Sequence, residues 1–140
     1  NYVSTLPPQR NAPRSSRVGG AQFGMKGIYI EQGVLFLQGI LANFSNIPYE
    51  PDYVRIYVKD RRRSKRTSHT EVELTPLLLL LTDQSREATQ RISVVFALKQ
   101  LTIADSKLLT IEVFEKNGDR SVRCHLSGKQ LLKARAVPSG

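Results

Sequence analysis

The sequence predicts an all-β fold, specifically an immunoglobulin-like β-sandwich of about seven strands with a short C-terminal helix. Three observations lead to this prediction. Short runs of alternating apolar and polar residues recur along the chain, turn-forming residues separate them, and one hairpin is specified by its cross-strand pairs. The length of 140 residues suits one domain with a core of its own. A small β-barrel is the alternative architecture.

The clearest local signal is a hairpin between Leu109 and Leu126. Asn117-Gly118 at its centre is typical of a two-residue type I′ turn, in which both residues have positive φ angles, and this turn sets the register. One face then pairs Leu109 with Leu126, Ile111 with Cys124, Val113 with Val122, and Glu115 with Arg120, and the other pairs Thr110 with His125, Glu112 with Arg123, Phe114 with Ser121, and Lys116 with Asp119. Cys124 is thereby predicted to be a buried structural thiol.

A second hairpin is predicted over Lys26–Ala42, with its turn at Gln32-Gly33. Its pairs are Ile28 with Leu37, Tyr29 with Phe36, and Ile30 with Leu35. The other expected elements are a loop over Asn43–Asp52, strands over Tyr53–Asp60, Glu71–Thr82 and Arg91–Leu101, and a helix capped by Ser127 that reaches Arg135. Pro76 interrupts the Glu71–Thr82 strand and favours a free sheet edge or a bulge there.

Composition divides the chain into two parts. Residues 1–21 are rich in Pro, Ser, Arg and Gly, which predicts a flexible linker, and residues 22–140 are predicted to form the β-sandwich domain. The apolar run Leu77–Leu81 is far shorter than the ~20 residues of a membrane-spanning helix. Because Asn1 is not a start methionine, we expect the chain to be a fragment that lacks an upstream export signal.

Charge is concentrated in one stretch. The chain has 21 basic and 12 acidic residues, a formal charge of +9, and residues 55–66 alone hold seven bases and one acid. This stretch is predicted to form a strand followed by a projecting loop, with Val54, Ile56 and Val58 facing inward. The candidate partner-binding residues on its outer face and loop are Arg55, Tyr57, Lys59, Arg61, Arg62, Arg63, Lys65 and Arg66.

Bases interleaved with tyrosines suit single-stranded nucleic acid, where aromatic rings stack on bases and cations neutralise phosphates. Two other interpretations stay open. The loop binds an acidic protein surface or lipid headgroups, or Glu71 and Glu73 on the returning strand neutralise the bases of the outgoing strand.

No catalytic arrangement is visible in the sequence. His69 and His125 are too isolated for a metal site, and Glu112 and Glu115 already have basic cross-strand partners. We therefore expect no enzyme activity, no cofactor and no metal.

Several separated motifs, in order, resemble the TraN family of conjugative transposon proteins from Bacteroidetes. The resemblance spans Gly27 to Val137. Its most distinctive pieces are Asn43 to Tyr49, Lys65-Arg66-Thr67, Glu71, and Glu115-Lys116-Asn117-Gly118.

The resemblance implies the C-terminal domain of a structural subunit of the mating-pair apparatus, a type IV secretion system. It further implies export to the periplasm or outer membrane, and partners that are other conjugation-apparatus proteins in a larger oligomeric complex. Contacts through sheet edges and the basic loop are expected. A nucleic-acid-binding module is the alternative.

Overall fold

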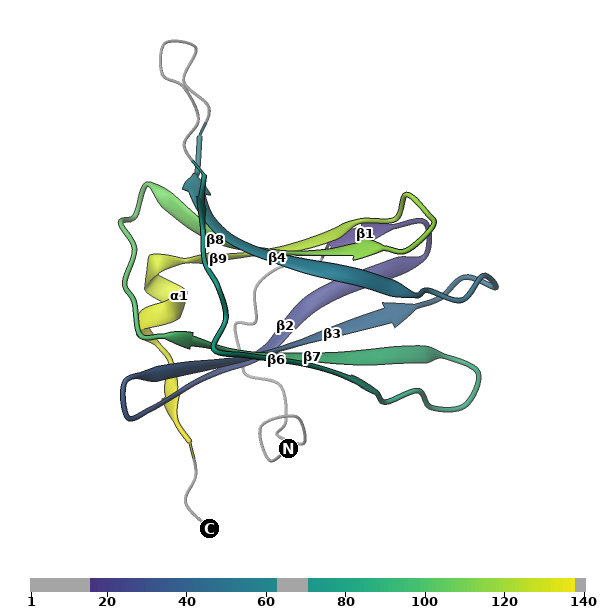
Figure 1. The fold of residues 1–140 in the computed structure, drawn as a ribbon, viewed down its shortest axis with the longest axis horizontal. Helices are drawn as coiled ribbons and strands as arrows, with labels where there is room; N and C mark the ends of the chain where they lie inside the picture. The colour runs from purple at the N-terminus through teal and green to yellow at the C-terminus, as the bar shows by residue number, and fades with distance from the viewer. Residues whose placement is uncertain (1–15, 63–70, 138–140) are drawn as a thin grey trace.

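Two β-sheets face each other across an apolar core (Figure 1). The computed structural model describes residues 16–62 and 71–137. Within these residues the elements in chain order are β1 (Ser16–Val18), β2 (Ala21–Glu31), β3 (Val34–Asn43), β4 (Pro51–Asp60), β5 (Val72–Glu73), β6 (Leu78–Asp83), β7 (Gln90–Lys99), β8 (Lys107–Glu115), β9 (Val122–Ser127), α1 (Gly128–Leu132) and β10 (Arg135–Ala136).

The strand order is that of an immunoglobulin-like sandwich. One sheet runs β1-β2-β3-β7-β6, with β10 also paired to β2, and the other runs β5-β4-β8-β9. Leaving aside β1 and β10, the strands β2 to β9 correspond in chain order to the immunoglobulin strands A, B, C, C′, D, E, F and G. The order β2-β3-β7-β6 is then A-B-E-D, and the order β5-β4-β8-β9 is C′-C-F-G. The fold class predicted from the sequence is therefore confirmed, although the strand count in the described residues is ten.

Alternating side chains from both sheets build the core. Phe23, Leu37 and Phe96 from one sheet meet Ile111 and Leu126 from the other, and all of these are fully buried. The β2–β3 hairpin has the predicted register, with Ile28 opposite Leu37. Its turn residues Gln32 and Gly33 have φ angles of 48° and 77°, as a type I′ turn requires.

The β8–β9 hairpin confirms most of the predicted pairs but corrects its turn. Ile111 lies opposite Cys124, and Glu112 opposite Arg123. Asn117 has a φ of 57°, whereas Gly118 has no positive φ, so the turn is not type I′. The strands end at Glu115 and Val122, and the predicted pairs of Phe114 with Ser121 and Lys116 with Asp119 do not form.

The predicted Glu71–Thr82 strand is two strands in different sheets. β5 pairs with β4, while β6 pairs with β7, and Pro76 lies in the crossover between them. The Leu74 N–H donates to the Ile56 carbonyl of one sheet, and the Leu77 N–H donates to the Ala97 carbonyl of the other. β6 is the edge strand that the proline indicated.

Both ends of the folded region differ from the predicted boundaries. β1 lies inside the predicted linker, and Ala21 is fully buried, so the fold begins before residue 22. Ser127 caps α1 through a capping box with Gln130, as predicted. The helix ends at Leu132 rather than Arg135, because Arg135–Ala136 joins β2 as a parallel strand.

Candidate functional site

The outer face of the four-stranded sheet holds the first of the predicted site residues, Arg55. Its Nε donates to Glu73 Oε1 at 2.6 Å and its Nη2 to Glu71 Oε1 at 3.1 Å. These two hydrogen bonds, first that to Glu73, raise the pKa of the Arg55 guanidinium. Glu71 and Glu73 therefore neutralise Arg55 of the outgoing strand. Arg55 has carboxylate partners within its own sheet.

Tyr57 corrects the expectation of an exposed aromatic platform. Only 3% of its surface is exposed, because the Arg55 guanidinium lies over the ring at 4.1 Å from its centroid. The Tyr57 hydroxyl donates to Glu112 Oε1 at 3.2 Å. Burial, and then the Glu112 carboxylate, raise the pKa of Tyr57. A covered ring cannot stack on a nucleic-acid base.

Glu112 is the buried acid beneath this face. It is 3% exposed and accepts a hydrogen bond from Arg123 Nε at 2.9 Å, which is the predicted cross-strand pair. A depression of about 710 Å³ opens above these residues, lined among others by Arg55, Lys59, Arg61, Glu71, Glu112 and Arg123. Within this lining Arg55 forms ion pairs with Glu71 and Glu112, and Arg123 forms one with Glu112.

The basic loop begins at the rim of this face. Lys59 is half-buried, and Arg61 and Arg62 are exposed. The remaining predicted loop residues, Arg63, Lys65 and Arg66, lie outside the described residues.

Cys124 and His125, for which the sequence predicted no catalytic or metal-binding role, are buried and half-buried, respectively. Burial raises the pKa of the Cys124 thiol to about 11, so the thiol stays protonated at neutral pH. His125 Nδ1 lies 2.9 Å from Thr110 Oγ1, and burial lowers the pKa of His125. Among residues 16–62 and 71–137, no group of His, Cys, Asp and Glu is arranged to hold a metal ion. The same residues contain no helix of the length and apolarity needed to cross a bilayer.

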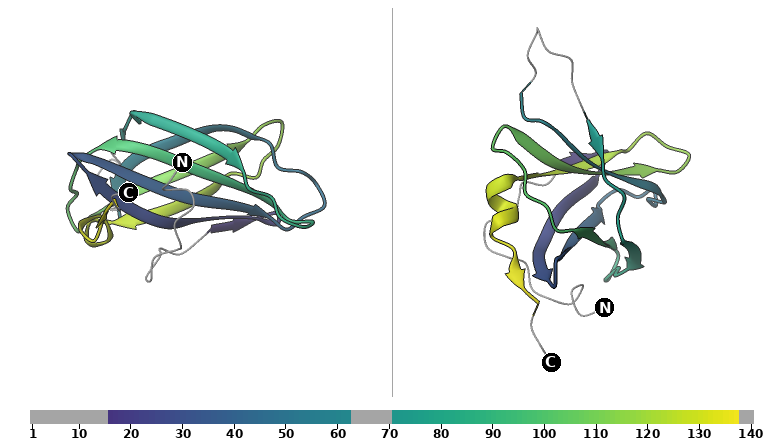
Figure 2. Two further views of the ribbon diagram at one scale, coloured as in Figure 1. Left: turned by 90° about the horizontal axis from the view of Figure 1, so that it is seen from below. Right: turned by 60° about the vertical axis from the view of Figure 1, so that its left-hand side comes forward.

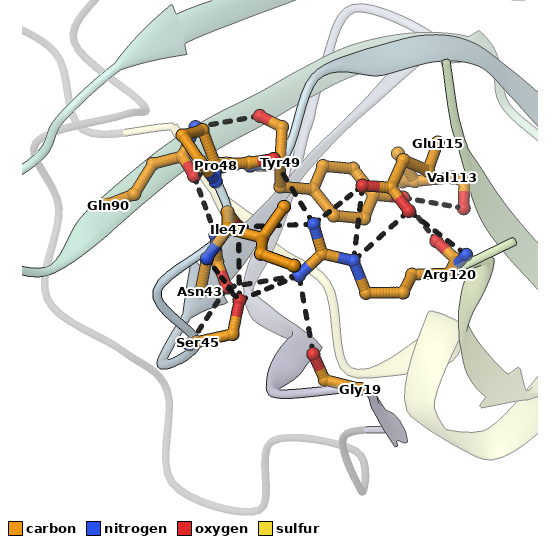
Figure 3. A network of polar contacts seen from close by, with 10 residues as sticks. All are labelled: Gly19, Asn43, Ser45, Ile47, Pro48, Tyr49, Gln90, Val113, Glu115 and Arg120. Atoms are coloured by element: carbon orange, nitrogen blue, oxygen red, sulfur yellow. Dashed lines mark hydrogen bonds and ion pairs between the residues drawn. The ribbon is translucent and has the colours of Figure 1, made fainter. Parts of the chain in front are cut away.

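Arg120 lies at the centre of a network of hydrogen bonds at one end of the sandwich, which we call the Arg120 clamp (Figure 3). Its Nη2 lies 2.6 Å from Glu115 Oε2, and this hydrogen bond lowers the pKa of Glu115. Its Nη1 donates to Ser45 Oγ at 2.9 Å and reaches the Gly19 carbonyl at 3.3 Å. The other acceptors of Arg120 are Asn43 Oδ1 and the carbonyls of Ile47 and Pro48.

Tyr49 also belongs to this Arg120 clamp. Its hydroxyl donates to the Arg120 carbonyl at 2.7 Å, and the guanidinium lies 5.2 Å from its ring centroid. Gln90 holds the loop from the other side, accepting from the Tyr49 N–H at 2.8 Å. Asn43 to Tyr49 and the turn after Glu115 therefore meet at this clamp. The side chains of Asn43, Ser45, Glu115 and Arg120 all form hydrogen bonds within the clamp.

β6 has the opposite character. All five residues of Leu77–Leu81 are exposed, with fractions between 36% and 64%. β6 pairs with β7 on one side only and forms the margin of its sheet (Figure 2, left, teal). Leucines on both faces and a bare backbone edge together form the surface that we call the leucine edge, Leu77–Leu81.

The backbone of the leucine edge has hydrogen-bonding groups to offer. The Gln84 N–H donates to the Arg91 carbonyl, which identifies a hydrogen-bonded pair of the β6–β7 ladder. Because such pairs alternate in an antiparallel ladder, the N–H and C=O groups of Leu79 and Leu81 are directed away from β7. An added strand would therefore find both leucine side chains and backbone groups.

Comparison with known proteins identifies a family. The family model described as DUF4138, a domain of unknown function, matches residues 11–136. The chain belongs to the DUF4138 family. No curated protein and no solved structure matches it.

In this DUF4138 domain Arg55, Tyr57 and Lys59 lie on β4, and Arg61 and Arg62 follow the strand. The fold also brings together two groups that sequence reasoning did not assemble. Of the Arg120 clamp, the sequence predicted only the pair of Arg120 with Glu115, because the other partners of Arg120 are more than seventy positions away in the chain. The leucine edge could have been found in the sequence, where five consecutive leucines follow Pro76.

Proposed function

We propose that this domain is a non-enzymatic structural subunit that works by binding other protein chains in the mating-pair apparatus of conjugative transfer. The observation that carries the proposal is the leucine edge. Monomeric proteins usually protect edge strands with charges, prolines or covering segments. Leu77–Leu81 has no charged residue, and all five of its leucines are exposed.

A protein strand satisfies this surface better than a lipid phase does. Lipid tails would accept the leucine side chains, but would leave the outward N–H and C=O groups of Leu79 and Leu81 unpaired. An added strand pairs those backbone groups and covers the leucines at the same time, which is the mode called β-augmentation. The chemistry of the leucine edge therefore favours a protein partner.

The cellular setting of the proposal comes from the sequence resemblance to TraN. The resemblance implies an exported subunit, on the periplasmic side or at the outer membrane, within a larger oligomeric complex. The exposed Arg61 and Arg62 begin a basic loop that would provide a second contact, with an acidic protein surface or lipid headgroups.

The nucleic-acid alternative loses support from the residues on β4. Arg55 is held by two carboxylates and the Tyr57 ring is covered. Neither residue can contribute the phosphate contact or the stacking for which it was considered.

The proposal is tested by co-purifying the full-length protein from detergent-solubilised membranes of donor cells. Three variants accompany the native form. The first changes Leu79 and Leu81 to Lys, the second changes Arg61, Arg62, Arg63, Lys65 and Arg66 to Glu, and the third is the control Leu132→Lys. Leu132 is an exposed leucine, 72% accessible, at the end of α1, away from either surface.

We expect the native protein and Leu132→Lys to elute in a large complex with other transfer proteins. The double lysine variant should elute alone. The loop variant should lose part of the complex, most strongly at low salt, where the electrostatic contact of the native loop is least screened. Elution of the native protein alone contradicts the proposal. Binding of single-stranded DNA that falls by orders of magnitude between about 50 and 200 mM salt would favour the nucleic-acid alternative instead.

A further inference from the structure

We infer that the leucine edge is occupied by a second copy of this chain, with the two β6 strands antiparallel and Leu80 facing the partner's Leu80 across a two-fold axis. This inference rests on the proposed function, because it names the partner of the same edge. It would join the two six-stranded sheets into one continuous sheet.

Self-complementarity is the first argument for a second copy. A strand added to β6 has leucine neighbours on both of its faces, so it must itself be apolar on both faces. Ordinary half-buried strands alternate apolar and polar residues and would place a polar row against leucine. Among the described strands, the exposed strand with the required continuous apolar run is β6 itself.

The backbone groups select one register. Leu79 and Leu81 direct their N–H and C=O groups outward, so these two residues must meet the outward groups of the other copy. With Leu80 on the axis, Leu79 exchanges both hydrogen bonds with the partner's Leu81, and the axis repeats the exchange on its other side. Leu80 then forms a pair without hydrogen bonds, the arrangement in which facing side chains are closest.

Charge and area set the expected strength. The paired segment Leu78–Thr82 contains no charged residue, so no like charges meet at the seam even though each chain carries +9. Covering the five leucines removes apolar surface on the order of half of the roughly 800 Å² per partner of a standard interface. The dimer should therefore be of micromolar strength. Salt should strengthen it, because it screens the repulsion between the two positive chains.

Cysteine cross-linking tests the register on the full 140-residue chain. In the proposed dimer the Cα atoms of residue 80 in the two copies lie about 4.5 Å apart. That separation lies within the range of about 4.4–6.8 Å that a disulfide bridges. The two copies of residue 79 are displaced along the strands and lie roughly 8–9 Å apart, beyond that range. The native Cys124 is fully buried and serves as the internal control.

We expect Leu80→Cys to form a covalent dimer under mild oxidation, while Leu79→Cys and the unchanged chain stay monomeric on a non-reducing gel. Light scattering at tens of micromolar should give about twice the chain mass of 15.7 kDa. Leu80→Lys should return it to one chain mass, and the matched Leu132→Lys should not. Because the Leu80 side chain is exposed, these substitutions leave the core intact.

Three results would overturn the inference. They are a monomer at every concentration, equal cross-linking at positions 79 and 80, or a dimer that survives Leu80→Lys. If the chain is monomeric alone but its complex in donor membranes still depends on Leu79 and Leu81, the occupant is a strand of another protein. The proposed function then stands and only the second copy is excluded. If neither dimer nor complex depends on the leucines, both proposals fail.

Discussion

The two margins of the six-stranded sheet differ in whether other segments cover them. At one margin, β2 is covered by β1 in antiparallel pairing and by β10 in parallel pairing, and the Arg120 clamp holds the Gly19 carbonyl just after β1. At the other margin, β6 has no strand beyond it among the described residues, and five leucines are exposed. The same sheet therefore contains a protected edge and an unprotected one.

The difference shows which margin of the sheet is free to pair with another chain. Covering an edge removes its capacity to pair with another chain, and the domain uses both of its terminal segments and an arginine cluster to cover β2. The leucine edge of the same sheet keeps that capacity, so it is the margin at which we expect a partner. Four predictions test the contrast, from the largest expected effect to the smallest.

Packing at the protected margin should contribute most to stability. Phe23 on β2 is fully buried in the core, so Phe23→Ala should lower the free energy of unfolding by about 3–5 kcal/mol. Leu79→Ala at the open margin should lower it by less than about 1 kcal/mol under conditions that keep the chain monomeric. Urea unfolding followed by circular dichroism measures both. Equal losses for the two variants would mean that the margins do not differ.

The Arg120 clamp should come next. Arg120→Met leaves Glu115, whose side chain is 9% exposed, without its cationic partner, and should cost about 3 kcal/mol. The matched variant Lys116→Met removes an exposed pair with Glu50 and should cost less than about 1 kcal/mol. If Arg120→Met is as mild as Lys116→Met in the same urea titration, the clamp does not hold the margin.

The clamp also predicts how the cost of Arg120→Met depends on pH. The hydrogen bond from Arg120 lowers the pKa of Glu115 below its ordinary value of 4.5. A lowered folded-state pKa means that the pair stabilises the fold fully above pH 4.5, and that this stabilisation is lost as the pH falls through the folded pKa. The stability difference between native and Arg120→Met should therefore shrink as the pH falls below 4.5. A difference that is constant from pH 7 to pH 3 would exclude an ionic role for the pair.

The smallest effect on stability is expected at the open margin. Leu79→Lys should change the free energy of unfolding by less than about 0.5 kcal/mol, because the Leu79 side chain is already exposed and lysine is common on natural edge strands. The same substitution should remove association with the partner strand, as measured by light scattering. A large loss of stability in a chain kept monomeric would show instead that Leu79 belongs to the core.

Several features of the fold could be predicted because they depend on neighbours in sequence or across one turn. The pairs of Ile111 with Cys124 and Glu112 with Arg123 follow from the register of a single hairpin, and the cap at Ser127 is a local hydrogen bond. The exposure of Tyr57 was predicted wrongly for the same reason. Alternation along a strand tells which face a side chain takes, and not whether another side chain covers it.

The same distinction between local and long-range contacts applies to the candidate surfaces. The sequence by itself determined the class of fold, the hairpin registers, the buried Cys124 and the edge position beside Pro76, because apolar alternation, turn chemistry and the missing proline N–H act locally. Only the tertiary structure decided that β5 and β6 belong to different sheets, that β10 covers β2, and that Arg120 joins Asn43 and Ser45. Those contacts join residues that are far apart in the chain, so no local pattern in the sequence specifies them.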